Sequence, residues 1–137
     1  MPSGKTHTFF NVALLIIITT AIYKMHTFNL NTAIFIGGLM FGTLLLSPDL
    51  DLSYSSVTGR WGILRILWFP YSLLFKHRGF SHHIIIGLLS RLLYLAILLA
   101  LLFLFIPFNI PKATYLLIFC GGILVADFMH IALDKIF

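Results

Sequence analysis

Four long apolar segments alternate with short polar stretches along this chain. They occupy residues 8–23, 32–46, 83–106 and 113–132. Segments of this kind predict membrane-spanning helices, although the first two are short for a hydrocarbon core of about 30 Å at a rise of about 1.5 Å per residue. We therefore expect these two helices to use flanking residues or to lie in a locally thinned bilayer.

The one long connection, residues 47–82, separates the second and third apolar segments. Its second half, residues 60–76, is apolar with basic ends. The aromatic side chains there that favour the headgroup level of a membrane are Trp61, Trp68 and Tyr71. We predict an interfacial helix, broken near Pro70, that lies on the membrane or dips into it. A fifth span is disfavoured by the length of this stretch, by Arg65 and by the proline.

The composition agrees with this pattern. Of the 137 residues, 60% are hydrophobic and 9% are charged, and the mean hydropathy is +1.04. A typical soluble domain has about 25% charged residues, so this chain has too few polar side chains to cover a water-facing surface. It is also too apolar to be disordered. We predict an all-α, polytopic membrane protein with four transmembrane helices plus an interfacial helix between helices two and three, in one membrane-embedded domain over residues 1–137.

The charged residues predict an orientation in the membrane. The formal net charge is +5, from nine Lys and Arg against four acidic residues. With four spans, one side would hold Lys5, Arg60, Arg65, Lys76, Arg78 and Lys135, and the other side would hold Lys24 and Lys112. Because cytoplasmic loops collect basic residues, we expect a multi-pass protein of the inner (plasma) membrane with both termini in the cytoplasm. Membrane lipid is the expected partner, and the scatter of basic residues argues against nucleic acid.

The ionisable residues gather at one end of this predicted bundle. The cytoplasmic end would receive His7, Asp49, Asp51, His77, His82, His83, Asp127, His130 and Asp134. Asp127, His130 and Asp134 have the spacing i, i+3 and i+7, which places them within about 60° on one helix face. Ionisable residues inside a membrane are costly and are functional candidates by default.

Arg91 is predicted to lie at the same depth as Asp127. Both residues fall on the cytoplasmic side of the bilayer centre if helices three and four cross it in opposite directions. We expect the Arg91 side chain to face the interior of the bundle. It would either pair with Asp127, locking two helices together, or bind an anion held in the site, and the sequence leaves both alternatives open.

Carboxylates and imidazoles gathered without a thiol favour a metal site. Imidazole suits Zn, Fe and Ni, carboxylate suits harder cations such as Mn, and mixed His/Asp sets are typical of catalytic rather than structural zinc. We expect a divalent metal, with Zn first and Mn or Fe as alternatives. The number of donors is enough for one ion or for two that share a bridging carboxylate, a pairing used in phosphoester hydrolysis. The one cysteine, Cys120, lies in an apolar run and carries no such prediction.

Several short motifs resemble a known family. They are Pro2-Ser-Gly-Lys-Thr-His7 with Asn11, Ser47-Pro-Asp-Leu-Asp51, Arg60-Trp-Gly, Trp68-Phe-Pro-Tyr71 and His77-Arg-Gly-Phe-Ser-His82. This combination resembles an uncharacterised family of bacterial, notably cyanobacterial, metal-binding membrane proteins, which is similar to the membrane-bound metal-dependent hydrolases. The resemblance implies the metal ligands His7, Asp49, Asp51, His77, His82 and Asp127. Helix periodicity adds His130 and Asp134 to that set.

The first functional hypothesis is a metal-dependent hydrolase at the cytoplasmic membrane face. Its substrate would be a phosphoester or a lipid-like molecule admitted from the membrane plane. Arg78 and Arg91 would neutralise the substrate anion, and His83 would act as an acid, a base or a support to the ligands. The second hypothesis is a non-catalytic protein stabilised by metal. The third is a transporter or a subunit of a larger complex, and a homo-oligomer is an open possibility because paired glycines allow close helix approach.

Overall fold

The computed structural model describes residues 4–75, 83–104 and 111–136, and these residues form helices and no strands. The prediction of an all-α chain is therefore confirmed over the described part. The helices in order are α1 (Gly4–Lys24), α2 (Leu30–Leu44), the 3-10 helix η1 (Pro48–Asp51), α3 (Ser56–Arg60), the 3-10 helix η2 (Gly62–Trp68), α4 (Phe69–Leu74), α5 (Ile84–Phe103) and α6 (Ala113–Ile136).

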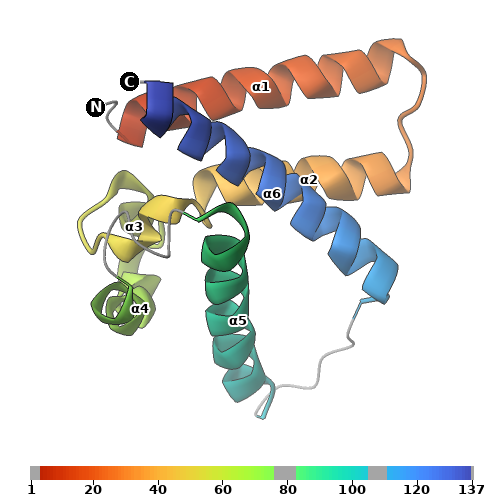
Figure 1. The fold of residues 1–137 in the computed structure, drawn as a ribbon. Coiled ribbons are helices and arrows are strands. Elements are labelled where there is room, and N and C mark those ends of the chain that lie inside the picture. Colours follow the sequence, from red (N-terminus) through yellow and green to blue (C-terminus); the bar gives the residue numbers. More distant parts are fainter. Residues whose placement is uncertain (1–3, 76–82, 105–110, 137) are drawn as a thin grey trace.

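Helices α1 and α2 form an antiparallel hairpin (Figure 1). The turn contains His26 in the left-handed region, with a φ of 53°. Asn29 then caps α2, because its side chain accepts a hydrogen bond from the Thr32 backbone while the Thr32 hydroxyl accepts one from the Asn29 backbone. The hairpin returns the chain to the end of the molecule where α1 begins.

The most extensive helix packing joins α2 to α6, which cross closely in Figure 1. Glycines at the crossing make this approach possible. A Cβ atom at Gly38 would clash with the carbonyl oxygen of Phe119, and one at Gly122 would clash with the carbonyl oxygen of Phe35. Small residues that let two backbones approach in this way are typical of helix pairs inside membranes. The packing holds the C-terminal half of α6 against the end of α2.

The predicted interfacial segment is present as η2 followed by α4, which meet at Trp68 and Phe69 beside the expected break at Pro70. Two of the three aromatic residues predicted at the headgroup level do not face outward, however. Trp68 and Tyr71 are 1% and 0% exposed and belong to a core cluster that packs against α5. The Tyr71 hydroxyl lies 2.9 Å from the Ser90 hydroxyl oxygen of α5. Burial raises the pKa of the Tyr71 hydroxyl.

The expectation of four membrane-length helices is corrected to three within the part of the chain that the structure describes. The helices long and apolar enough to cross a membrane are Thr6–Lys24, Ile84–Leu102 and Ala113–Ile136. The remaining apolar helix of the four that were expected, α2, has 15 residues and a length of only about 22 Å. Its limits are set by the Asn29 cap at its start and by the turn of the chain into η1 directly after Ser47.

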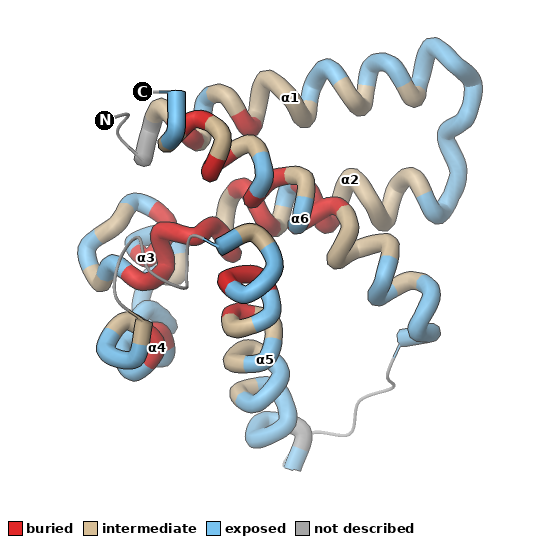
Figure 2. Tube along the Cα trace, in the orientation of Figure 1, coloured by how far each residue is buried: buried red, intermediate tan, exposed pale blue. Residues whose placement is uncertain are grey.

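Apolar side chains on the long helices face outward rather than inward. Ile17 of α1 is 65% exposed and Leu93 of α5 is 64% exposed. Figure 2 shows buried residues gathered where the start of α1, the end of α2, η1 and the C-terminal half of α6 meet. The outward apolar faces are consistent with membrane association. The buried meeting point is the place where the ionisable residues converge.

Candidate metal centre

The C-terminal half of α6 carries two buried ionisable residues and a third at the edge of the buried region. Asp127 and His130 are 0% and 1% exposed, and Asp134 follows one turn later at the edge of the buried stripe. The one-face prediction for these three residues therefore agrees with the structure. Their side chains nevertheless engage two separate sets of partners, because Asp127 is directed to α5 while His130 and Asp134 are directed to α1 and η1.

The first set, which we call the His–Asp cluster, consists of His7, Asp49, His130 and Asp134. The rings of His7 and His130 are stacked with their centroids 4.0 Å apart and their planes at 22°. His7 Nε2 lies 3.2 Å from Asp134 Oδ1. His130 Nε2 lies 3.4 Å from Asp49 Oδ1 and 3.7 Å from Asp134 Oδ2. The start of α1, η1 and the end of α6 thus contribute to one site.

These distances fit the spacing of ligands around one metal ion. Zinc ligands lie about 2.0–2.1 Å from the ion, so two donors at a tetrahedral angle are roughly 3.3–3.4 Å apart. One donor atom from each of His7, His130 and Asp134 lies within 4.8 Å of the others. His130 Nε2 also approaches two carboxylates, whereas a single N–H group donates well to one. The donor set and its spacing therefore suit a divalent cation.

Two polar residues outside the predicted set hold the cluster in position. The Ser47 hydroxyl oxygen lies 3.2 Å from His130 Nδ1. This contact fixes the ring so that Nε2 faces the carboxylates, which is the usual role of a group behind a metal-binding histidine. Asn11 Nδ2 donates to the carbonyl oxygen of Ala126 at 3.2 Å and ties α1 to α6. Ser47 entered the sequence prediction as the first residue of the motif that ends at Asp51, and its place two residues before Asp49 was the available signal.

The second set is an ion pair between Arg91 of α5 and Asp127 of α6. Both side chains are 0% exposed, and Arg91 Nη2 donates to Asp127 Oδ2. Of the two alternatives for Arg91, the structure shows the pairing with Asp127. The same pairing leaves Asp127 outside the group formed by His7, His130 and Asp134. A role of Asp127 as a metal ligand stays a prediction, as does a substrate-binding role of Arg91.

The remaining predicted residues fall in different places. Asp51 is 4% exposed, and its charge is, after burial, one of the causes of the raised pKa of Tyr71. His83 caps α5, because its Nδ1 accepts from the Ile86 backbone at 3.4 Å. Three predicted residues lie outside the described residues, namely His77, Arg78 and His82.

Together, the fold and the cluster define a protein whose described part is all-helical and holds a candidate His/Asp metal site. The chain belongs to a family described as uncharacterized metal-binding protein (DUF2227), which matches residues 2–118. A relative, an uncharacterized protein of Aquifex aeolicus (strain VF5), is 34% identical over 119 residues, covering 71% of this chain and 84% of the relative. No solved structure matches the chain. The family match includes His7 and Asp49, and neither description names a hydrolase.

Proposed function

We propose that this protein is embedded in a membrane and binds a divalent metal through His7, Asp49, His130 and Asp134. The observation that carries the proposal is the convergence of two imidazoles and a carboxylate within 4.8 Å, at the point where α1 begins and α6 ends. The three long apolar helices support the membrane location. The short α2 would lie beside α1 in the same membrane, because its far end returns to the cluster.

Zinc is the first choice of metal, with manganese or iron as alternatives. Two imidazoles with two carboxylates match zinc sites, and a second ion would need the predicted ligands His77 and His82. The excess of Lys and Arg on the cluster side supports placing this end, with both termini, at the cytoplasmic face of the inner membrane.

We further propose that the metal centre hydrolyses a phosphoester or lipid-like substrate. When bound, such a metal activates water and polarises a phosphoryl or carbonyl oxygen. The chain's own part would be to hold the metal with His7, His130 and Asp134 and to orient His130 through Ser47. An open pocket of about 420 Å³ is lined by Asp51 but by none of the four cluster residues, so a substrate would have to reach the metal by another route. The alternative is a metal that only joins α1 to α6, which the burial of His7 and His130 favours.

The test is the metal content of tag-free protein, purified without chelators and measured by mass spectrometry. The wild type is expected to hold about one or two ions per chain, and His130→Ala and Asp134→Ala to hold almost none. His26→Asn is the matched control, because His26 is exposed and lies at the far end of α1. Equal metal in the wild type and His130→Ala would contradict the proposed site.

The activity is tested separately with the metal-loaded protein. It is expected to hydrolyse p-nitrophenyl phosphate or a short-chain phospholipid, while chelated protein and the His130→Ala variant do not. Stoichiometric metal without turnover on either substrate, combined with a lower unfolding temperature after chelation, would establish the non-catalytic alternative instead.

A further inference from the structure

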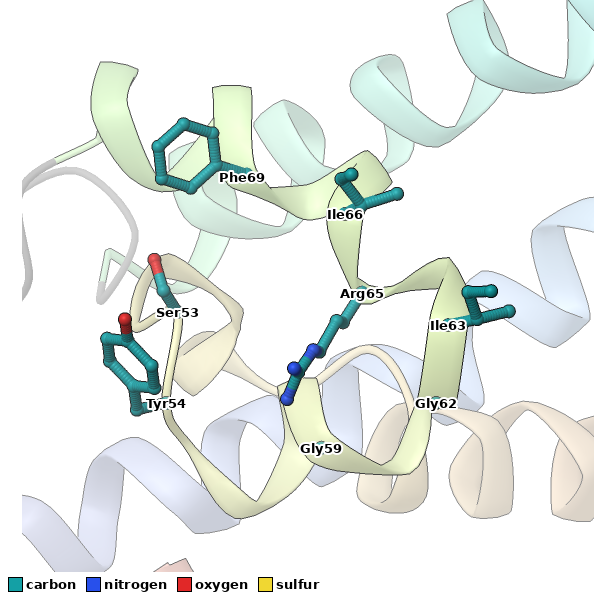
Figure 3. Close-up of a pocket in the computed structure, with 8 residues that line it drawn as sticks. All are labelled: Ser53, Tyr54, Gly59, Gly62, Ile63, Arg65, Ile66 and Phe69. Carbon is teal, nitrogen blue, oxygen red and sulfur yellow. The ribbon is translucent and has the colours of Figure 1, made fainter.

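A pocket of about 660 Å³ lies apart from the metal centre, between the loop after η1 and the helices α3 and η2. Figure 3 shows its lining. The residues that matter here are Ser53, Tyr54, Gly59, Arg65, Ile66 and Phe69. The lining contains one cation and no acid. The pocket is therefore suited by charge to an anion.

Arg65 is the charged group of this pocket. Its side chain extends from η2 toward the side that holds Gly59, with Tyr54 on another side (Figure 3). Among the residues that the structure describes, none forms a hydrogen bond or an ion pair with the guanidinium. Arg60, by contrast, donates to the carbonyl oxygen of Leu44 at 3.1 Å and to the Thr8 hydroxyl at 2.8 Å. The guanidinium of Arg65 thus keeps its donors available to a ligand.

The rim of the pocket is apolar and exposed. Tyr54 is 98% exposed, Ile63 is 89% exposed, and Ile66 and Phe69 are 71% and 53% exposed. An apolar surface around a basic group is typical of segments that lie in the membrane interface, where anionic headgroups meet acyl chains. A soluble anion would use the cation and gain nothing from this rim.

We propose that this pocket binds the phosphate of an anionic phospholipid headgroup. Arg65 and the Tyr54 hydroxyl contact the phosphate, since both donate hydrogen bonds and guanidinium is a strong partner for phosphate. Ile66 and Phe69 contact the adjoining acyl chains. The inference rests on the proposed membrane location and not on the metal. It assigns η2 and α4 the task of holding a lipid at the membrane surface.

Tryptophan fluorescence can report the binding of a lipid at this pocket. Of the chain's two tryptophans, Trp61 is half-buried and adjoins Gly62 of the pocket lining in the sequence, whereas Trp68 is 1% exposed and serves as the internal reference. Phospholipids with brominated acyl chains quench tryptophan on contact. Protein in nonionic micelles is titrated with brominated phosphatidylglycerol or brominated phosphatidylcholine. We expect phosphatidylglycerol to reach half-maximal quenching at the lower mole fraction.

Two variants test the pocket itself. Arg65→Gln is expected to weaken phosphatidylglycerol binding about tenfold, because it removes a charge-assisted contact. Gly59→Phe is expected to abolish the preference by filling the pocket. It should fold, because a Cβ atom at Gly59 meets nothing within 4 Å. Lys112→Gln is the matched control, since it removes one exposed positive charge outside the pocket.

The outcomes separate this inference from the proposed function. Loss of the lipid preference in Arg65→Gln, with its metal content unchanged, supports the pocket independently of the metal. Equal quenching by both lipids, or an unchanged preference in Arg65→Gln with native far-ultraviolet circular dichroism, overturns it. Full competition by inorganic phosphate at millimolar concentration would also overturn the lipid assignment, because it would show a site for the free anion.

Discussion

The His–Asp cluster and the Arg91–Asp127 pair lie within two turns of α6, yet their buried ionisable groups have different kinds of partner. In the pair, a protein cation meets a protein anion, and both are 0% exposed. In the cluster, side chains from α1, η1 and α6 bring together imidazoles and carboxylates, which are the common ligands of divalent metals. In the pair, two protein charges of opposite sign offset each other. The cluster instead gathers the donor groups of a candidate metal site.

This difference shows that burial of an ionisable residue does not by itself assign a role. Asp127 and His130 lie on the same face of the same helix, three residues apart, and are equally buried. Their partners decide their chemistry, because α5 presents Arg91 to one while α1 presents His7 to the other. The pair should therefore control stability, and the cluster should control metal binding.

The largest effect is expected on the stability of the protein when the Arg91–Asp127 ion pair is broken. Asp127→Ala leaves Arg91 buried without its counter-ion and should lower the free energy of unfolding by about 3–5 kcal/mol. Unfolding in micelles can be followed by tryptophan fluorescence. The double variant Arg91→Met with Asp127→Leu should recover most of the loss, since no buried charge remains. A double variant as unstable as Asp127→Ala alone would argue against a simple ion pair.

The second largest effect, on metal affinity, is expected when Ser47 is replaced. Ser47→Ala removes the group beside His130 Nδ1 and should weaken metal binding about tenfold to hundredfold, as is usual for groups that orient a ligand. Competition with a chelating indicator measures this affinity. Ser90→Ala is the matched control, because Ser90 lies on α5 beside the ion pair, and its metal affinity should equal that of the wild type. Equal losses in both variants would mean that the two regions are coupled.

The smallest effect is expected from Tyr71. Tyr71→Phe removes the hydrogen bond to Ser90 and should lower the free energy of unfolding by about 1 kcal/mol. Metal content should stay at the wild-type value, because the tyrosine belongs to the core around the pair. Thermal unfolding alongside metal analysis checks both points. A loss of metal in this variant would contradict the separation of the two regions.

Much of this arrangement could be predicted from residue spacing along single helices. The period of α6 places Asp127, His130 and Asp134 on one face, and depth arithmetic brings Arg91 to the level of Asp127. Those two predictions succeed because a helix has fixed geometry. The structure was needed to decide whether Arg91 pairs with Asp127 or binds an anion. Residue spacing along one helix does not show which face of α5 contacts which face of α6.

Other features depend on packing between distant segments. The limits of α2 depend on the Asn29 cap and on the turn into η1, so the helix occupies Leu30–Leu44 and not the predicted residues 32–46. Trp68 and Tyr71 look like membrane-surface residues from their type, but α5 covers them. Contact between His7 and His130 joins residues at opposite ends of the chain, and this contact follows only from how α1 and α6 cross.

The order in which the residues of the His–Asp cluster are synthesised has a consequence for its assembly. His7 and Asp49 are synthesised before His130 and Asp134 of α6. The cluster therefore cannot form until α6 has been synthesised and has packed against α2 at the glycine crossing. The proposed metal binding would follow that step, and a product cut short before α6 would carry His7 and Asp49 without their partners on α6.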